Sequence, residues 1–202
     1  MGNCATRRSR VVSEETQEAH SGFHRHGSYA YVSNFSESER EVLINLVGQI
    51  LELLGERRDN HGDDLLAAMI GITSHDSPPD DGVLLRLLPN AYADQVDASE
   101  FRRYTEATLR AKKSANAMSM HIDLKSSPDG CIEVDHGGAN AWLGAMNDIR
   151  LALGVRLNVQ EKSREDLEIL GPNDPLRGVY AVYSWLGWLQ ESLILALMDE
   201  TL

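Results

Sequence analysis

Cysteine is scarce in this sequence of 202 residues, which contains only Cys4 and Cys131. Two cysteines cannot form the disulfide framework that stabilises small secreted proteins, and no apolar signal region follows the first residue. Long hydrophobic runs are also missing, because Gln190 and Glu191 interrupt the most apolar stretch, 185–198. That stretch is shorter than the roughly 18 apolar residues that cross a bilayer. We therefore expect a cytoplasmic protein without a membrane segment.

Positive charge is also in short supply. The sequence has 19 Lys and Arg residues against 31 Asp and Glu residues, which gives a formal net charge of -12. A surface built throughout for nucleic-acid phosphates needs the opposite balance. The composition leaves room for a local cationic stripe, and it favours contacts with basic protein surfaces.

Sequence motifs for catalysis are missing. The chain has no glycine-rich phosphate loop, no G-x-S-x-G elbow and no H-E-x-x-H pair. His20, His24 and His26 cluster near the N-terminus, but a zinc site needs three or four ligands at fixed geometry and no Cys-x-x-Cys pair accompanies them. We expect no enzyme activity, no cofactor and no metal, with an uncharacterised enzyme or metal-binding protein as an alternative.

The pattern of apolar residues predicts a mostly α-helical chain. Residues 1–22 are polar and lack an apolar period, which is typical of a disordered tail, and 23–202 are predicted to form one helical regulatory domain. One short strand is expected within 23–35, and 131–135 form either a strand or a loop. The fold class is a single-domain helical bundle with a buried C-terminal helix and one or two short strands.

Helix boundaries follow from capping signals and apolar periodicity. A capping box from Ser36 to Glu39 opens a helix that ends at Gly55. The final helix is apolar nearly all round, as is typical of the centre of a bundle. Further helices are predicted over 63–70, 83–88, 97–122 and 139–157, and the final helix over 175–198.

The helix over 97–122 has two contrasting faces. Its apolar residues follow strict three-and-four spacing, which makes a narrow seam that is either internal or a homodimer face. The seam consists of Phe101, Tyr104, Thr108, Ala111, Ala115, Met118 and Ile122. The opposite face is predicted to carry solvated cations, which could instead contact a protein partner or DNA. These cations are Arg102, Arg103, Arg110 and Lys113.

Two arginines lie on or beside the apolar face of the helix over 139–157. Arg150 and Arg156 would need an anion if they were buried. Glu191 in the final helix is the predicted partner, so these three residues are expected to form a structural ion pair.

The two thiols form a candidate redox pair. Cys4 is flanked by Arg7, Arg8 and Arg10, which would lower the pKa of its thiol and increase the thiolate fraction. A reactive thiol with a resolving partner such as Cys131 is a redox-sensor pattern. The alternative is two unrelated free cysteines.

Three segments together resemble a known family. They are RLLPNAY at 86–92 continuing to EFRRYTE at 100–106, MNDIRLALGVRL at 146–157, and YAVYSWLGWLQE at 180–191. In this order, over about 28–198, the chain resembles an actinobacterial family long catalogued as a domain of unknown function. That family is now associated with oxidative-stress transcriptional regulators of the AosR type.

The resemblance implies a helical cytoplasmic regulator that influences transcription during oxidative stress through RNA polymerase or a sigma factor. No catalytic residues follow from it. Our hypothesis is a regulator that acts mainly through protein contacts, with oxidation of Cys4 and Cys131 as its candidate switch. Direct DNA binding through the Arg-rich helix at 100–122 is the alternative.

Overall fold

The computed structural model describes residues 22–55, 78–159, 162 and 164–199. The predicted mostly α fold is confirmed, and within the described residues no helix is long and apolar enough to span a bilayer. The predicted tail at 1–22, apart from its last residue, and the predicted helix at 63–70 lie outside the described residues. The helices are α1 (Glu37–Gly55), α3 (Gly82–Leu87), α4 (Gln95–Ser126), α5 (His136–Leu157), α6 (Arg164–Glu168) and α7 (Leu176–Met198).

A small antiparallel sheet accompanies the helices. Its strands are β1 (His24–His26), β2 (Ala30–Asn34) and β3 (Cys131–Val134), in that spatial order. The single strand expected within 23–35 is therefore a hairpin, and Gly27 supplies the positive φ of 69° in its turn. Sequence alternation did not reveal this turn because the flanking strands are only a few residues long.

Capping side chains fix where the helices begin. The capping box of α1 is confirmed: the Ser36 N–H donates to a Glu39 carboxylate oxygen at 2.8 Å, and the Glu39 N–H donates to Ser36 Oγ at 3.3 Å. The N-cap of α4 lies three residues before the predicted one, because Asp94, not Asp97, accepts the first backbone N–H groups. Asp135 caps α5 in the same way.

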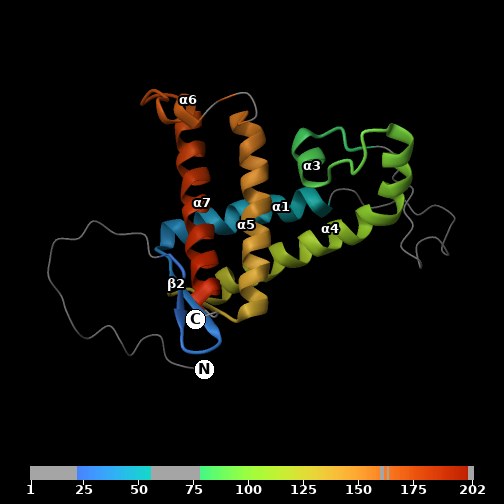
Figure 1. Ribbon diagram of the computed structural model, residues 1–202. Coiled ribbons are helices and arrows are strands. Elements are labelled where there is room, and N and C mark those ends of the chain that lie inside the picture. The colour runs from blue at the N-terminus through green and yellow to red at the C-terminus, as the bar shows by residue number, and fades with distance from the viewer. Residues whose placement is uncertain (1–21, 56–77, 160–161, 163, 200–202) are drawn as a thin grey trace, which may run out of the picture.

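Helix α5 is the central element of the fold. It contacts α1, α3, α4, α7 and two of the strands, and Figure 1 shows it beside α7, with both helices crossing α1. Its Trp142 is fully buried, stacks on Phe35 at 6.0 Å between ring centroids and meets the edge of Phe23 at 5.4 Å. This aromatic cluster joins the hairpin to the helices.

The buried position predicted for the final helix holds for one of its faces. Leu186, Leu189 and Leu193 on α7 are fully buried against the core. Trp188 and Leu195 are exposed on the other face. An all-round apolar helix therefore lies at the edge of the fold, because α5 occupies the centre.

Candidate functional site

Helix α4 has its two faces reversed relative to the sequence-based prediction. All seven residues of the predicted apolar seam are exposed, and the large ones retain 43% (Phe101), 54% (Tyr104), 47% (Met118) and 53% (Ile122) of their accessible surface. The prediction of a solvated cationic face was wrong for Arg102, Arg110 and Lys113, which bond to groups inside the fold. Arg103 is exposed as predicted.

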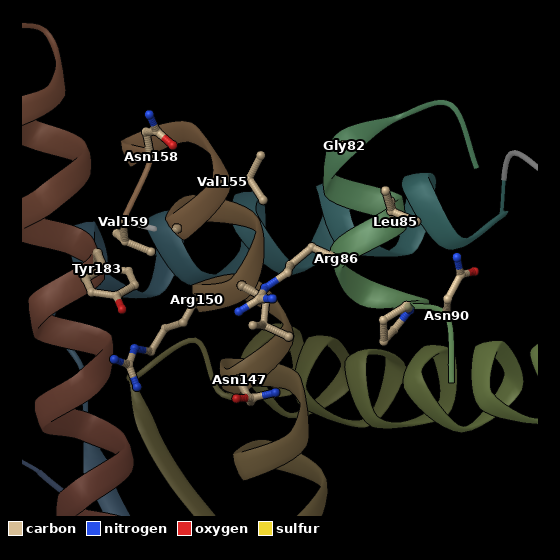
Figure 2. Close-up of a pocket in the computed structure, with 13 residues that line it drawn as sticks. Gly82, Leu85, Arg86, Asn90, Asn147, Arg150, Val155, Asn158, Val159 and Tyr183 are labelled. Atoms are coloured by element: carbon tan, nitrogen blue, oxygen red, sulfur yellow. The ribbon is translucent and has the colours of Figure 1, made fainter. Parts of the chain in front are cut away.

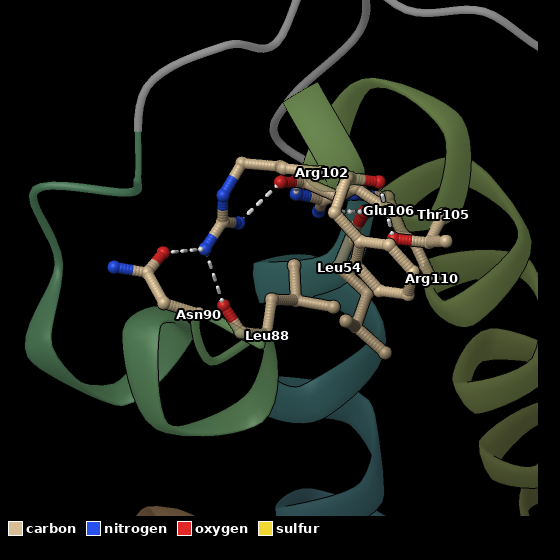
Figure 3. A network of polar contacts seen from close by, with 8 residues as sticks. Leu54, Leu88, Asn90, Arg102, Thr105, Glu106 and Arg110 are labelled. Carbon is tan, nitrogen blue, oxygen red and sulfur yellow. Dashed lines mark hydrogen bonds and ion pairs between the residues drawn. The ribbon is translucent and has the colours of Figure 1, made fainter. Parts of the chain in front are cut away.

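Two of the inward cations, Arg102 and Arg110, form a network around one buried carboxylate (Figure 3). Glu106 accepts a hydrogen bond from Arg102 at 2.5 Å and another from Arg110 at 2.8 Å. Arg102 also donates to the Leu88 carbonyl at 3.0 Å, and Arg110 donates to the Leu54 carbonyl at 2.9 Å. The network thereby joins α4 to the C-terminal ends of α1 and α3.

These contacts explain why the cations point inward. The last carbonyls of a helix lack intrahelical partners and carry the negative end of the helix dipole. Helix α1 has no basic residue in its own last turn, so Arg110 of α4 supplies the positive charge and the donor. Arg102 does the same at Leu88, the C-cap residue of α3. The periodicity of α4 carries no information about unpaired carbonyls at the ends of other helices.

The charge state of Glu106 follows from its surroundings. Burial by itself raises the pKa of this carboxyl, but hydrogen bonds and charge from Arg110 and Arg102 outweigh burial and hold the pKa below its usual value. Glu106 is therefore an anion at neutral pH, and it compensates two guanidinium groups on the inner face.

A second inward ion pair joins α4 to α5. Lys113 donates to an Asp148 carboxylate oxygen at 2.5 Å, and Asp148 is buried. Burial raises the pKa of Asp148, and the hydrogen bond and charge from Lys113 offset only part of this effect. The helices also approach closely where a Cβ at Gly144 would lie 2.4 Å from Asn116 Nδ2.

Cys131 lies at the first position of β3, half-buried. It is disulfide-bonded, and in the strand register it is opposite Asn34 of β2. The preceding turn needs Gly130, whose φ is +79° and whose absent Cβ would collide with the Phe35 carbonyl. The other cysteine of the sequence, Cys4, lies outside the described residues, so the predicted Cys4–Cys131 pairing stays a prediction.

Arg150 has a different partner from the one that the sequence suggested. It donates to the neutral Gln190 side chain at 2.7 Å, and its guanidinium lies 4.7 Å from the centre of the Tyr183 ring. Glu191 and Arg156 are both exposed. Because Gln190 and Glu191 point in different directions from α7, adjacency in sequence did not identify the acceptor.

Arg150 also lines a cavity of about 550 Å³ between α3, α5 and α7 (Figure 2). Arg86 reaches into this cavity from α3, and Tyr183 borders it on α7. The contact of Arg150 with Tyr183 and Gln190 links α5 to α7 at the side of the cavity. We therefore regard Arg150 as a residue that positions two helices.

The predicted histidine cluster is only partly described. His24 and His26 lie in β1, and His20 lies outside the described residues. Within the described part of the chain, no three His, Cys, Asp or Glu side chains come close enough to hold a metal ion.

Comparisons with known proteins give one consistent result. The model of the family described as "Domain of unknown function (DUF2017)" matches residues 20–197. The "Oxidative stress regulator AosR" of Mycobacterium tuberculosis (strain H37Rv) is 35% identical over 183 residues, which cover 83% of this chain and 82% of that protein. The "Putative oxidative stress regulator AosR" of Mycobacterium leprae is 37% identical over 176 residues, 79% of each chain. No solved structure matches.

Proposed function

Because this chain belongs to the DUF2017 family, and mycobacterial relatives that it matches over about four fifths of their length are named oxidative stress regulators, we propose that it regulates transcription during oxidative stress. It does so mainly through contacts with RNA polymerase or a sigma factor. Cys4 and Cys131 are its redox switch. The observation that carries the switch is the disulfide at Cys131.

The position of Cys131 explains how oxidation would reach the fold. Its strand pairs directly with β2, and β2 continues through Phe35 into the aromatic cluster around Trp142. A bond from Cys4 to Cys131 attaches the N-terminal segment to this sheet. The surface that a partner meets on the sheet then differs between the oxidised and reduced proteins.

The redox step uses peroxide as the oxidant. The thiolate of Cys4 attacks one peroxide oxygen and becomes a sulfenic acid, with release of hydroxide. The thiol of Cys131 then attacks the sulfenic sulfur, which forms the disulfide and releases water. Each thiol loses one electron and one proton, so that one hydrogen peroxide is reduced to two waters.

A protein partner is better supported than DNA. The chain has a net charge of -12, and three of the four cations in the proposed DNA-contacting face are engaged inside the fold. Phosphate contacts need exposed cations. Direct DNA binding through this predicted face of α4 would therefore lack three of its four cations.

The switch can be tested on the purified full chain with limiting hydrogen peroxide. Oxidation of the wild type should lower the intact mass by two hydrogens and change its mobility on a non-reducing gel. Cys4→Ser and Cys131→Ser should each prevent both changes. A single-cysteine variant that still loses two hydrogens, or a wild type that keeps both thiols, would contradict the switch.

The regulator role is tested separately by binding. Purified RNA polymerase, with and without sigma factors from the same organism, is presented to the oxidised and reduced protein and to the Cys4→Ser/Cys131→Ser double variant. We expect one redox state of the wild type to bind more tightly, and the double variant to behave the same with and without peroxide. Equal absence of binding in both states would contradict the proposed partner.

A further inference from the structure

The exposed face of α4 is an apolar surface that no described element of the chain covers. We name the seven seam residues the outer strip: Phe101, Tyr104, Thr108, Ala111, Ala115, Met118 and Ile122. At 1.5 Å per residue the strip is about 32 Å long. Contiguous exposed apolar surface of this extent marks an interaction site in soluble proteins. Tyr92, which meets the edge of the Phe101 ring at 5.5 Å, adds to its aromatic end.

The spacing of the outer strip fits another helix. Its members recur every three and four residues over three heptads, which is the pattern that keeps one seam facing a partner helix in a coiled coil. The strip lies opposite the residues that α4 buries against α1 and α5, such as Met120 and Leu124. A second helix can therefore pack on the strip without displacing α1 or α5 from the inner face of α4.

The distribution of size and charge along the strip favours a second copy of this chain. Large side chains occupy both ends of the strip, and small ones occupy its middle. Exposed Asp97 and Glu100 flank the N-terminal end, and exposed Lys125 flanks the C-terminal end. An interface with twofold symmetry has to be complementary to itself, and these acids and this lysine are complementary when α4 meets α4 in the antiparallel direction.

We propose that the chain forms a homodimer in which the outer strips of two α4 helices pack antiparallel. One such register places Tyr104 against Ile122, Thr108 against Met118, and Ala111 against Ala115 of the second copy. The small residues let the two helix axes come close at the centre. Asp97 and Lys125 of opposite copies then lie at the same end of the interface. A parallel arrangement would place like charges together at both ends.

The first test is sedimentation velocity of the reduced full chain over a range of concentrations. The wild type should form a dimer whose fraction rises with concentration. Ala111→Glu places a charge at the centre of the interface and should weaken the dimer by at least about tenfold. Ile169→Glu is the matched control, since Ile169 is an exposed apolar residue distant in sequence from α4, and it should leave the dimer unchanged.

A wild type that stays monomeric at every concentration, or a dimer that Ala111→Glu and Ile169→Glu affect equally, would overturn the proposal. The reducing conditions separate this test from that of the redox switch, because no disulfide is needed for the dimer.

The second test determines the direction of the pairing. Asp97→Lys and Lys125→Asp each place like charges together in the antiparallel dimer, and each should weaken it by about threefold. The double variant Asp97→Lys/Lys125→Asp restores opposite charges and should regain most of the affinity. In a parallel dimer the single variants would exchange one like-charge pair for another, and a double variant no tighter than the singles would overturn the antiparallel arrangement.

Discussion

The inner and outer faces of α4 make opposite use of the same helix. The inner face contacts α1 and α5 and holds a carboxylate, Glu106, between two guanidinium groups. The outer strip exposes aromatic and aliphatic side chains. Burying ions costs several kcal/mol each unless they are well paired, and exposing apolar surface forgoes its hydrophobic stabilisation. The difference teaches that burial of apolar side chains alone does not determine which face of α4 points inward. Polar contacts on the inner face contribute to that orientation.

The inner network has a specific structural consequence. Arg102 and Arg110 each reach a particular backbone carbonyl, at Leu88 and Leu54, and Glu106 holds both guanidinium groups. Sliding or rotating α4 would leave those donors unpaired in the interior, at a cost of about 1–3 kcal/mol for each group. The network therefore fixes the register of α4, and so fixes where the outer strip faces.

The largest expected effect comes from removing the carboxylate of the inner face. Glu106→Gln keeps the size of the side chain and leaves two inward guanidinium groups without an anion. We expect a loss of about 3–5 kcal/mol in the free energy of unfolding, measured with urea. Glu100→Gln on the outer side of the same helix should change it by no more than about 0.5 kcal/mol. Similar losses for the two variants would show that the network does not hold α4 in place.

A smaller effect concerns how Glu106 and Asp148, the two buried carboxylates, change stability as the pH falls. The pKa of Glu106 is lowered from 4.5, so its stabilisation is full above that value and is lost as the pH falls through the lowered pKa. The pKa of Asp148 is raised from 3.8. As the pH falls, the folded state therefore protonates Asp148 before the unfolded state does, and the contribution of this carboxyl to the free energy of unfolding becomes more favourable.

Urea midpoints between about pH 5 and pH 3 should therefore respond in opposite ways to the two substitutions. Glu106→Gln should make the loss of stability on acidification less steep than in the wild type, and Asp148→Asn should make it steeper. A change in the same direction for both variants would mean that the two carboxyls have the same sign of pKa shift, contrary to their different partners.

Much of the fold could be predicted from the sequence because its signals are local. The Ser36 and Glu39 pair marked the start of α1, and Pro89 follows directly after α3 and its C-cap residue. These signals act within a few residues of where they occur. The hairpin at β1 and β2 was missed because its strands are too short to show a period.

The candidate surfaces were harder to predict because their determinants are distant in sequence. The orientation of α4 depends on carbonyls at Leu54 and Leu88, which lie 56 and 14 positions from the arginines that bind them. The partner of Arg150 depends on which way α7 turns Gln190. The sequence left two roles open for the seam, an internal contact and a dimer face, since three-and-four spacing is the same for an internal and an external partner.

The smallest expected effect is on the outer strip, and a pair of methionines isolates it. Met118 and Met120 are two residues apart on α4, with 47% and 0% of their surface exposed. At concentrations where the chain is monomeric, Met118→Ala should change the free energy of unfolding by no more than about 0.5 kcal/mol. Met120→Ala should cost about 2–5 kcal/mol, because it leaves a cavity in the core.

Met118→Ala should nevertheless weaken the dimer in sedimentation, since this side chain lies within the proposed interface. If Met118→Ala destabilised the dilute monomer as much as Met120→Ala does, the outer strip would be part of the core and would not be available to a second copy.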